Sequence, residues 1–237
     1  MKTNQSYALA IHTASPDLGL AIGTIAGEPR IQVWKNLGRD LSTEFHDRLA
    51  AFLSPQNWAD LAFIAVAKGP GGFTGTRLGV VAARTLAQQL DIPLFAVSTL
   101  AVIAWDAYLA NFQETWTLPP SDSEWVEIAV QMPAQRGELH TAIYSVLRPN
   151  SEAIVSSQSN EEAMRPVLKV KRADAVLNQD EWLKTLAELQ TPYQLVQAEG
   201  GLGQTAAALL DLANLEWQSG HRPHWSEALP FYGQSPV

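Results

Sequence analysis

A glycine-rich loop that could hold an anion is the strongest candidate for chemistry in this sequence of 237 residues. It reads Gly-Pro-Gly-Gly-Phe-Thr-Gly from Gly69 to Gly75, and it lies between an apolar run and a segment with helical spacing. Backbone N–H groups at the start of a helix can cradle a phosphate or a carboxylate. We therefore consider a nucleotide or anion loop made of Gly69, Gly71, Gly72, Thr74, Gly75 and Arg77.

The two common nucleotide-loop patterns do not fit this segment. No Gly-Lys-Ser/Thr follows at the spacing of a P-loop, and Thr74 stands where a dinucleotide-binding loop has its third glycine. A tight turn, whose glycines allow positive φ or close packing, explains the same residues. The residues alone favour this structural turn, and a nucleotide contact at Thr74 or Arg77 stays open.

Other polar groups are weaker candidates. Two histidines at 221 and 224, and His46 beside two carboxylates, do not supply three convergent metal ligands, so we expect no metal. Ser98-Thr99 lacks the Gly-x-Ser-x-Gly elbow of a nucleophile and is typical of a helix cap. The pattern Gly201-x-Gly203 lacks the acidic partner of a dinucleotide site and indicates a helix start.

Composition excludes several functions. The formal charge of −8 argues against direct binding to a phosphate backbone, which needs clustered Lys and Arg. Without cysteine there is no disulfide, zinc-thiolate site or thiol nucleophile. Charged residues make up 17%, against roughly 25% in average domains, which indicates apolar surface kept for a partner.

The sequence shows no targeting or membrane segment. Residues 1–6 are polar and lack the basic and long apolar regions of a signal peptide. No apolar stretch approaches the roughly 18 residues that a membrane span needs. We therefore expect a cytoplasmic protein that does not bind a membrane.

Apolar spacing predicts an opening lobe of alternating strands and helices. Three short β-rich runs indicate an antiparallel meander, and later strands alternate with amphipathic helices. This order is typical of a ribonuclease-H-like α/β lobe with a mixed sheet. The predicted strands are 7–13, 18–25, 30–37, 61–67 and 94–97, and the predicted helices are 42–54, 77–90 and 99–112.

A loop rich in proline and serine, residues 115–123, predicts a domain boundary. We therefore expect an N-terminal ribonuclease-H-like lobe at 1–114 and a smaller C-terminal lobe at 115–237. Residues 150–174 are polar and show no clear period. The second lobe is predicted to hold strands at 125–130 and 139–147 and helices at 179–189 and 203–219.

A longer pattern resembles a known family. From Gly69 to Gly79 the chain reads Gly-Pro-Gly-Gly-Phe-Thr-Gly-Thr-Arg-Leu-Gly, which is similar without a gap to the signature loop of the TsaB family. Leu9-Ala-Ile-His-Thr-Ala-Ser and Pro230-Phe-Tyr resemble that family's opening strand and closing segment. The resemblance implies an actin-like ATPase (ribonuclease-H-like) fold of two lobes with mixed sheets, the second lobe reduced.

The same resemblance implies a function. TsaB proteins are non-catalytic partners of TsaD, which acts with the ATPase TsaE to transfer a threonylcarbamoyl group to the tRNA adenosine beside the anticodon. It implies that tRNA is reached indirectly through the complex, that the chain alone can form a homodimer, and that ATP binds, if at all, only within the complex. The alternatives are an active nucleotide-dependent phosphotransferase or ATPase of the same superfamily, and a homodimeric scaffold unrelated to tRNA.

The sequence departs from the family at informative positions. His12 replaces the family's Asp in the first strand, and Pro133-Ala134-Gln135 replaces its Asp-Ala-Arg turn. Carboxylate oxygens suit a hard cation such as magnesium better than imidazole does. The helix after Ser98-Thr99 also lacks the paired metal histidines of the catalytic relative. These changes favour a chain that is not itself an enzyme.

The predicted helix 77–90 carries more apolar surface than a single core face requires. An amphipathic helix needs an apolar stripe of only about 100° or somewhat more. The surplus indicates contact with a partner, although a helix enclosed within one fold would show the same pattern. In the TsaB family this helix and the preceding one contact TsaD, so the resemblance implies an interface containing Phe45, Leu49, Leu78, Val81, Ala82 and Leu86.

Overall fold

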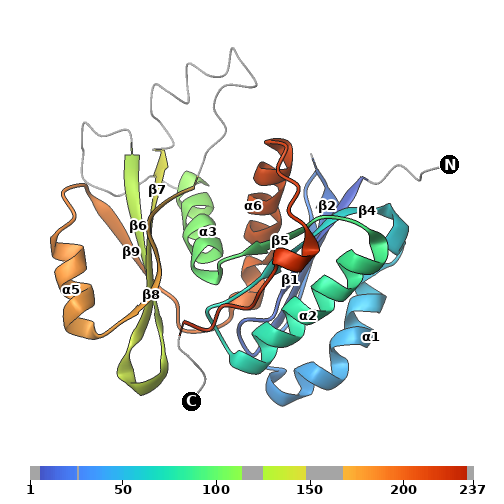
Figure 1. Ribbon diagram of the computed structural model, residues 1–237, viewed down its shortest axis with the longest axis horizontal. Coiled ribbons are helices and arrows are strands. Elements are labelled where there is room, and N and C mark those ends of the chain that lie inside the picture. The colour runs from blue at the N-terminus through green and yellow to red at the C-terminus, as the bar shows by residue number, and fades with distance from the viewer. Residues whose placement is uncertain (1–5, 26, 114–124, 148–167, 234–237) are drawn as a thin grey trace, which may run out of the picture. The chain divides into compact units, whose positions relative to one another are not determined.

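The computed structural model describes residues 6–25, 27–113, 125–147 and 168–233. The chain forms two compact units, which we describe separately (Figure 1). The first unit combines Met1–Val102 with Gly200–Val237, and the second is Ile103–Glu199. No helix in the described part of the chain is both long and apolar enough to cross a membrane.

A mixed five-stranded sheet forms the centre of the first unit. Its order is β3-β2-β1-β4-β5, in which β1 to β3 are an antiparallel meander and β4 and β5 run parallel to β1. All seven residues of β4 are buried, as its unbroken apolar run predicts. The strands are β1 Tyr7–His12, β2 Leu18–Thr24, β3 Arg30–Trp34, β4 Leu61–Ala67 and β5 Leu94–Val97.

Helices cover both faces of this sheet (Figure 1). On one face lie α1, Leu41–Leu53, and α2, Phe73–Leu90; on the other lies α6, Ala206–Gln218. α3, Thr99–Gln113, follows β5. The α1/α2 face holds the main core, which includes Leu9, Ile11, Phe45, Leu49, Phe52, Ile64, Val66, Val80 and Ala83. The predicted ribonuclease-H-like order of strands and helices is confirmed.

The unit boundaries differ from the predicted division at residue 115. α6 comes late in the chain, yet it packs against β1, β2, β4 and β5 of the first sheet. Most of α3 belongs to the second unit. Local composition marked a loop as the boundary, whereas long-range burial of an apolar helix determines which sheet that helix joins.

The second unit combines a smaller mixed sheet with α5, Gln179–Ala187, and most of α3. The order of this sheet is β8-β7-β6-β9, with β6 to β8 antiparallel and β9 parallel to β6. α5 begins with a reciprocal capping box between Asn178 and Glu181. Trp182 and Leu186 pack on Ala129 and Ile143. The strands are β6 Trp125–Pro133, β7 Leu139–Leu147, β8 Lys169–Leu177 and β9 Tyr193–Gln197.

Short 3-10 turns connect these elements. They are Gly38–Asp40, Trp58–Asp60, Gln135–Gly137, Leu202–Thr205 and Trp225–Glu227. The turn at Leu202–Thr205 lies immediately before α6, where the Gly201-x-Gly203 pattern predicted a helix start. That prediction is confirmed.

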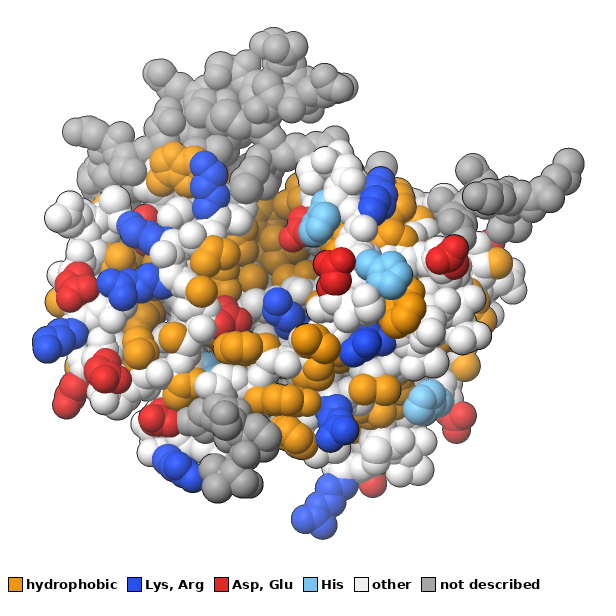
Figure 2. Space-filling view, in the orientation of Figure 1, with side chains coloured by type: hydrophobic (Ala, Val, Ile, Leu, Met, Phe, Trp, Pro, Cys, Tyr) orange, Lys and Arg blue, Asp and Glu red, His pale blue; other side chains and the backbone are white. Residues whose placement is uncertain are grey.

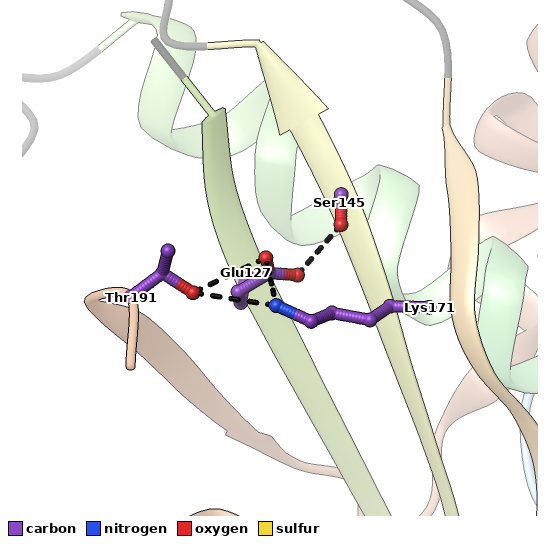
Figure 3. Close-up of polar contacts among 4 residues, drawn as sticks. All are labelled: Glu127, Ser145, Lys171 and Thr191. Atoms are coloured by element: carbon purple, nitrogen blue, oxygen red, sulfur yellow. Dashed lines mark hydrogen bonds and ion pairs between the residues drawn. The ribbon is translucent and has the colours of Figure 1, made fainter. Parts of the chain in front are cut away.

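A buried carboxylate ties together four segments of the second unit (Figure 3). The Glu127 side chain on β6 is 4% exposed, and its Oε1 lies 2.6 Å from Lys171 Nζ on β8. Ser145 Oγ on β7 donates to Glu127 Oε2 at 2.7 Å, and Thr191 Oγ1 donates to Oε1 at 3.2 Å. Because a buried charge needs partners, this network fixes the strands beside α5.

Candidate functional site

The glycine loop joins β4 to α2, and its glycines permit close backbone packing. A Cβ on Gly69 would lie 2.1 Å from the carbonyl oxygen of Phe231, and φ there is +101°. A Cβ on Gly71 would lie 2.2 Å from the carbonyl oxygen of Ala14. Any side chain at either position would therefore displace backbone. These contacts support the tight-turn interpretation of the loop.

The loop residues that could meet a nucleotide lie on its outer side. Thr74 and Arg77 are exposed in the first turns of α2, and Gly75 is half-buried. The Gly72 N–H already donates to the Ala14 carbonyl at 2.8 Å, so one amide of the supposed cradle is occupied. Nucleotide or anion binding at Thr74 and Arg77 stays a prediction.

Buried polar groups surround the loop. The hydroxyl oxygens of Thr13, Thr76 and Thr99 are buried and have no hydrogen-bond partner among the described residues. At the end of β1, His12 is 0% exposed. Both its ring nitrogens are buried and have no hydrogen-bond partner among the described residues. Burial lowers the pKa of His12 to about 4. The position where the resemblance implies a carboxylate therefore holds a neutral imidazole at neutral pH.

The histidines considered as metal ligands have local partners instead. His221 Nδ1 lies 2.7 Å from Glu216 Oε2, and His224 Nδ1 lies 2.7 Å from Ser226 Oγ. In the described ranges no three His, Asp or Glu side chains gather where they could hold a metal ion. Ser98 Oγ accepts from the Leu100 N–H at 3.1 Å, as a helix cap does.

The predicted interface residues separate into outward and inward ones. Val81 on α2 is 52% exposed. Leu78, Ala82 and Leu86 are partly buried and pack against the core of the first unit. Phe45 and Leu49 on α1 are 0% and 3% exposed and belong to that core. The apolar spacing of α1 marks the side that packs on its own sheet, so these two residues are not accessible to a partner here.

A second set of outward apolar residues was not predicted. Phe73 at the start of α2 is 47% exposed and packs against the tilted ring of Tyr232, with the ring centroids 4.6 Å apart. Leu229, in the same C-terminal segment, is 62% exposed. We call Ala228–Gly233 the C-terminal strap. The Pro230-Phe-Tyr motif was the only sequence signal for it, and its position over the α2 start follows from tertiary contacts.

Basic side chains are dispersed on the visible face of the molecule. Figure 2 shows the described Lys and Arg side chains scattered among hydrophobic and acidic ones rather than gathered into one patch. A nucleic-acid-binding surface usually carries Lys and Arg in a patch or stripe. The distribution on this face agrees with the acidic composition of the chain.

Comparison with known proteins relates the chain to tRNA modification proteins. A family model described as TsaD, tRNA N6-adenosine threonylcarbamoyltransferase, matches residues 50–120. The tRNA threonylcarbamoyladenosine biosynthesis protein TsaB of Bacillus subtilis (strain 168) is 35% identical over 155 residues, 64% of this chain and 60% of that protein. TsaB of Escherichia coli (strain K12) is 40% identical over 52 residues, 22% of each chain. These matches span less than two thirds of the relatives' length.

Solved structures define the fold class. A crystal structure of a Pseudomonas aeruginosa protein with similarity to peptidase YeaZ has a TM-score of 0.68 at 21% identity, and it covers 97% of this chain and 100% of that one. YeaZ from P. aeruginosa gives 0.64 at 21% identity, covering 96% and 99%. The chain therefore has the YeaZ-type α/β fold with two mixed sheets. The sequence matches show that part of the chain is similar to TsaB proteins, and the residues matched by the family model include the loop Gly69–Gly79.

Proposed function

We propose that this chain is a non-catalytic subunit of the complex that forms threonylcarbamoyladenosine on tRNA. It would pair with a TsaD-like catalytic subunit, act with a TsaE-like ATPase, and support transfer of the threonylcarbamoyl group to the adenosine beside the anticodon. The observation that carries the proposal is the sequence match to TsaB over 155 residues. We place this activity in the cytoplasm.

The outer surface of α2 supports a partner-binding role. Val81 is 52% exposed in the middle of the helix, with partly buried Leu78 and Ala82 beside it. Small residues allow a helix of another chain to approach closely, because they leave shallow grooves between ridges. A partner seated on this surface would cover Val81 without disturbing the core below it.

The end of β1 supports a non-catalytic role. Phosphoryl transfer needs magnesium held by oxygen ligands and a positioned base. His12 offers a buried neutral imidazole where the family has a carboxylate, and its pKa near 4 keeps it neutral at physiological pH. The alternative, an active phosphotransferase or ATPase, predicts ATP hydrolysis by the isolated chain that is lost in Thr74→Ala.

Activation by such a subunit follows from differential binding. A partner shifts an enzyme toward its active conformation only by the difference between its affinities for the two conformations. The chain would therefore need no reactive group of its own. With a formal charge of −8 it would contact tRNA through the complex rather than alone.

The test compares two valine substitutions. Val81→Arg puts a charge on the proposed interface, and Val170→Arg is the matched control, because Val170 on β8 is 63% exposed. We expect Val81→Arg to weaken binding to the TsaD-like subunit by at least about tenfold and to lower tRNA modification in the reconstituted system. Val170→Arg should leave both unchanged. Equal binding by Val81→Arg and wild type would refute the proposed surface.

A further inference from the structure

The start of α2 is weakly stabilised by its own sequence. Gly72 occupies the N-cap position, and no side chain accepts a hydrogen bond from the first-turn amides. Gly75 and Gly79 lie within the first turns, where each glycine disfavours helix by a factor of about two to five relative to alanine. Some other part of the fold must hold this end of the helix.

The C-terminal strap supplies that support (Figure 1). After α6 the chain passes along α2 through the turn Trp225–Glu227, which contacts that helix. Ala228 is 2% exposed and anchors the strap in the core. The strap ends on α2, where the Tyr232 ring packs against the Phe73 ring at an interplanar angle of 34°.

The strap also fixes the turn that precedes α2. The Phe231 N–H donates to the Lys68 carbonyl at 2.7 Å. The absence of a side chain on Gly69 lets the Phe231 carbonyl approach, since a Cβ there would lie only 2.1 Å away. On its other side, the Gly69 carbonyl accepts from the Thr99 N–H at 2.9 Å. The turn is thus held between the strap and the first residue of α3.

We propose that the C-terminal strap is a clasp that completes the uncapped start of α2 and thereby controls how well α2 binds the partner. This inference rests on the proposed function, because the partner surface is the one described above. When the strap releases, the first turn of α2 loses the Phe73–Tyr232 pair and frays. A frayed start of α2 no longer holds Leu78 of the partner surface in one conformation, and affinity falls by the fraction of molecules in which the helix start is unfolded.

Hydrogen exchange of the isolated full-length chain tests the clasp directly. In Tyr232→Ala we expect the amides of residues 76–79 to exchange about two- to tenfold faster, the range for loss of one aromatic pair. Residues 83–86 in the middle of α2 should be unchanged. Tyr232→Phe keeps the ring and should match wild type, as should Leu229→Ala, which removes an exposed side chain from the same strap. Equal exchange at 76–79 in Tyr232→Ala and wild type would overturn the clasp.

Binding to the TsaD-like subunit tests the coupling. Tyr232→Ala should lose affinity by the fraction of molecules in which exchange shows residues 76–79 to be open, while Tyr232→Phe binds as wild type does. An affinity loss that differs from this open fraction would overturn the coupling. If the wild-type chain does not bind that subunit, the proposed function fails, and exchange alone then upholds or overturns the clasp.

Discussion

Acid should destabilise this protein through His12, and replacing that residue should remove part of the loss. Burial lowers the pKa of His12 from 6.5 to about 4, so the folded chain takes up this proton less readily than the unfolded chain. The contribution of neutral, buried His12 to the free energy of unfolding is therefore complete above pH 6.5. This contribution is lost as the pH falls from 6.5 toward 4. Between about pH 7.5 and about pH 5 this single group should cost about 2 kcal/mol.

The assay is urea unfolding of wild type and His12→Leu at both pH values. The informative quantity is the difference between their pH-dependent losses, because other titrating groups contribute equally to both chains. We expect the loss in His12→Leu to be smaller by about 2 kcal/mol. Equal losses in wild type and His12→Leu would refute the reasoning.

Two further predictions concern the turn and the buried carboxylate. Lys171→Met leaves the Glu127 charge buried without its ion-pair partner. Because the lysine is 38% exposed, we expect the free energy of unfolding, measured with urea, to fall by only about 1–3 kcal/mol. A decrease below about 0.5 kcal/mol would contradict this account. Gly71→Ala places a Cβ 2.2 Å from the Ala14 carbonyl and should lower the thermal midpoint by several degrees, corresponding to about 1–3 kcal/mol. Gly200→Ala, with no atom within 4 Å of its Cβ, is the control, and equal midpoints for the two variants would show that the loop relaxes freely.

The spacing of apolar residues predicted most of the first sheet, because the strands of that sheet and the helices on it bury one or both of their faces completely. The run at Leu61–Ala67 is buried at every position, so it could only be an interior strand. The start of α2 was predicted at Arg77 but lies at Phe73. Glycines at 72 and 75 indicate a turn when considered alone, and only contacts with the Thr13 and Ala14 backbone and with the strap make a helix there favourable.

Other features depend on contacts that a sequence does not display. β8 carries mainly exposed residues, so its apolar alternation is weak and no strand was predicted there. The inward direction of Phe45 and Leu49 depends on which side of α1 meets the sheet. The residue-level anion site at Thr74 and Arg77 stays a prediction, and part of the poorly patterned segment 150–174 lies outside the described residues.

The central claim is that this chain binds a TsaD-like subunit through α2, and sedimentation tests it most directly. Wild type, Val81→Arg and Val170→Arg would each be mixed with the TsaD-like protein of the same organism, with and without ATP. We predict a stable heteromer for wild type and Val170→Arg and none, or a much weaker one, for Val81→Arg. Absence of a wild-type heteromer under both conditions would contradict the proposed function.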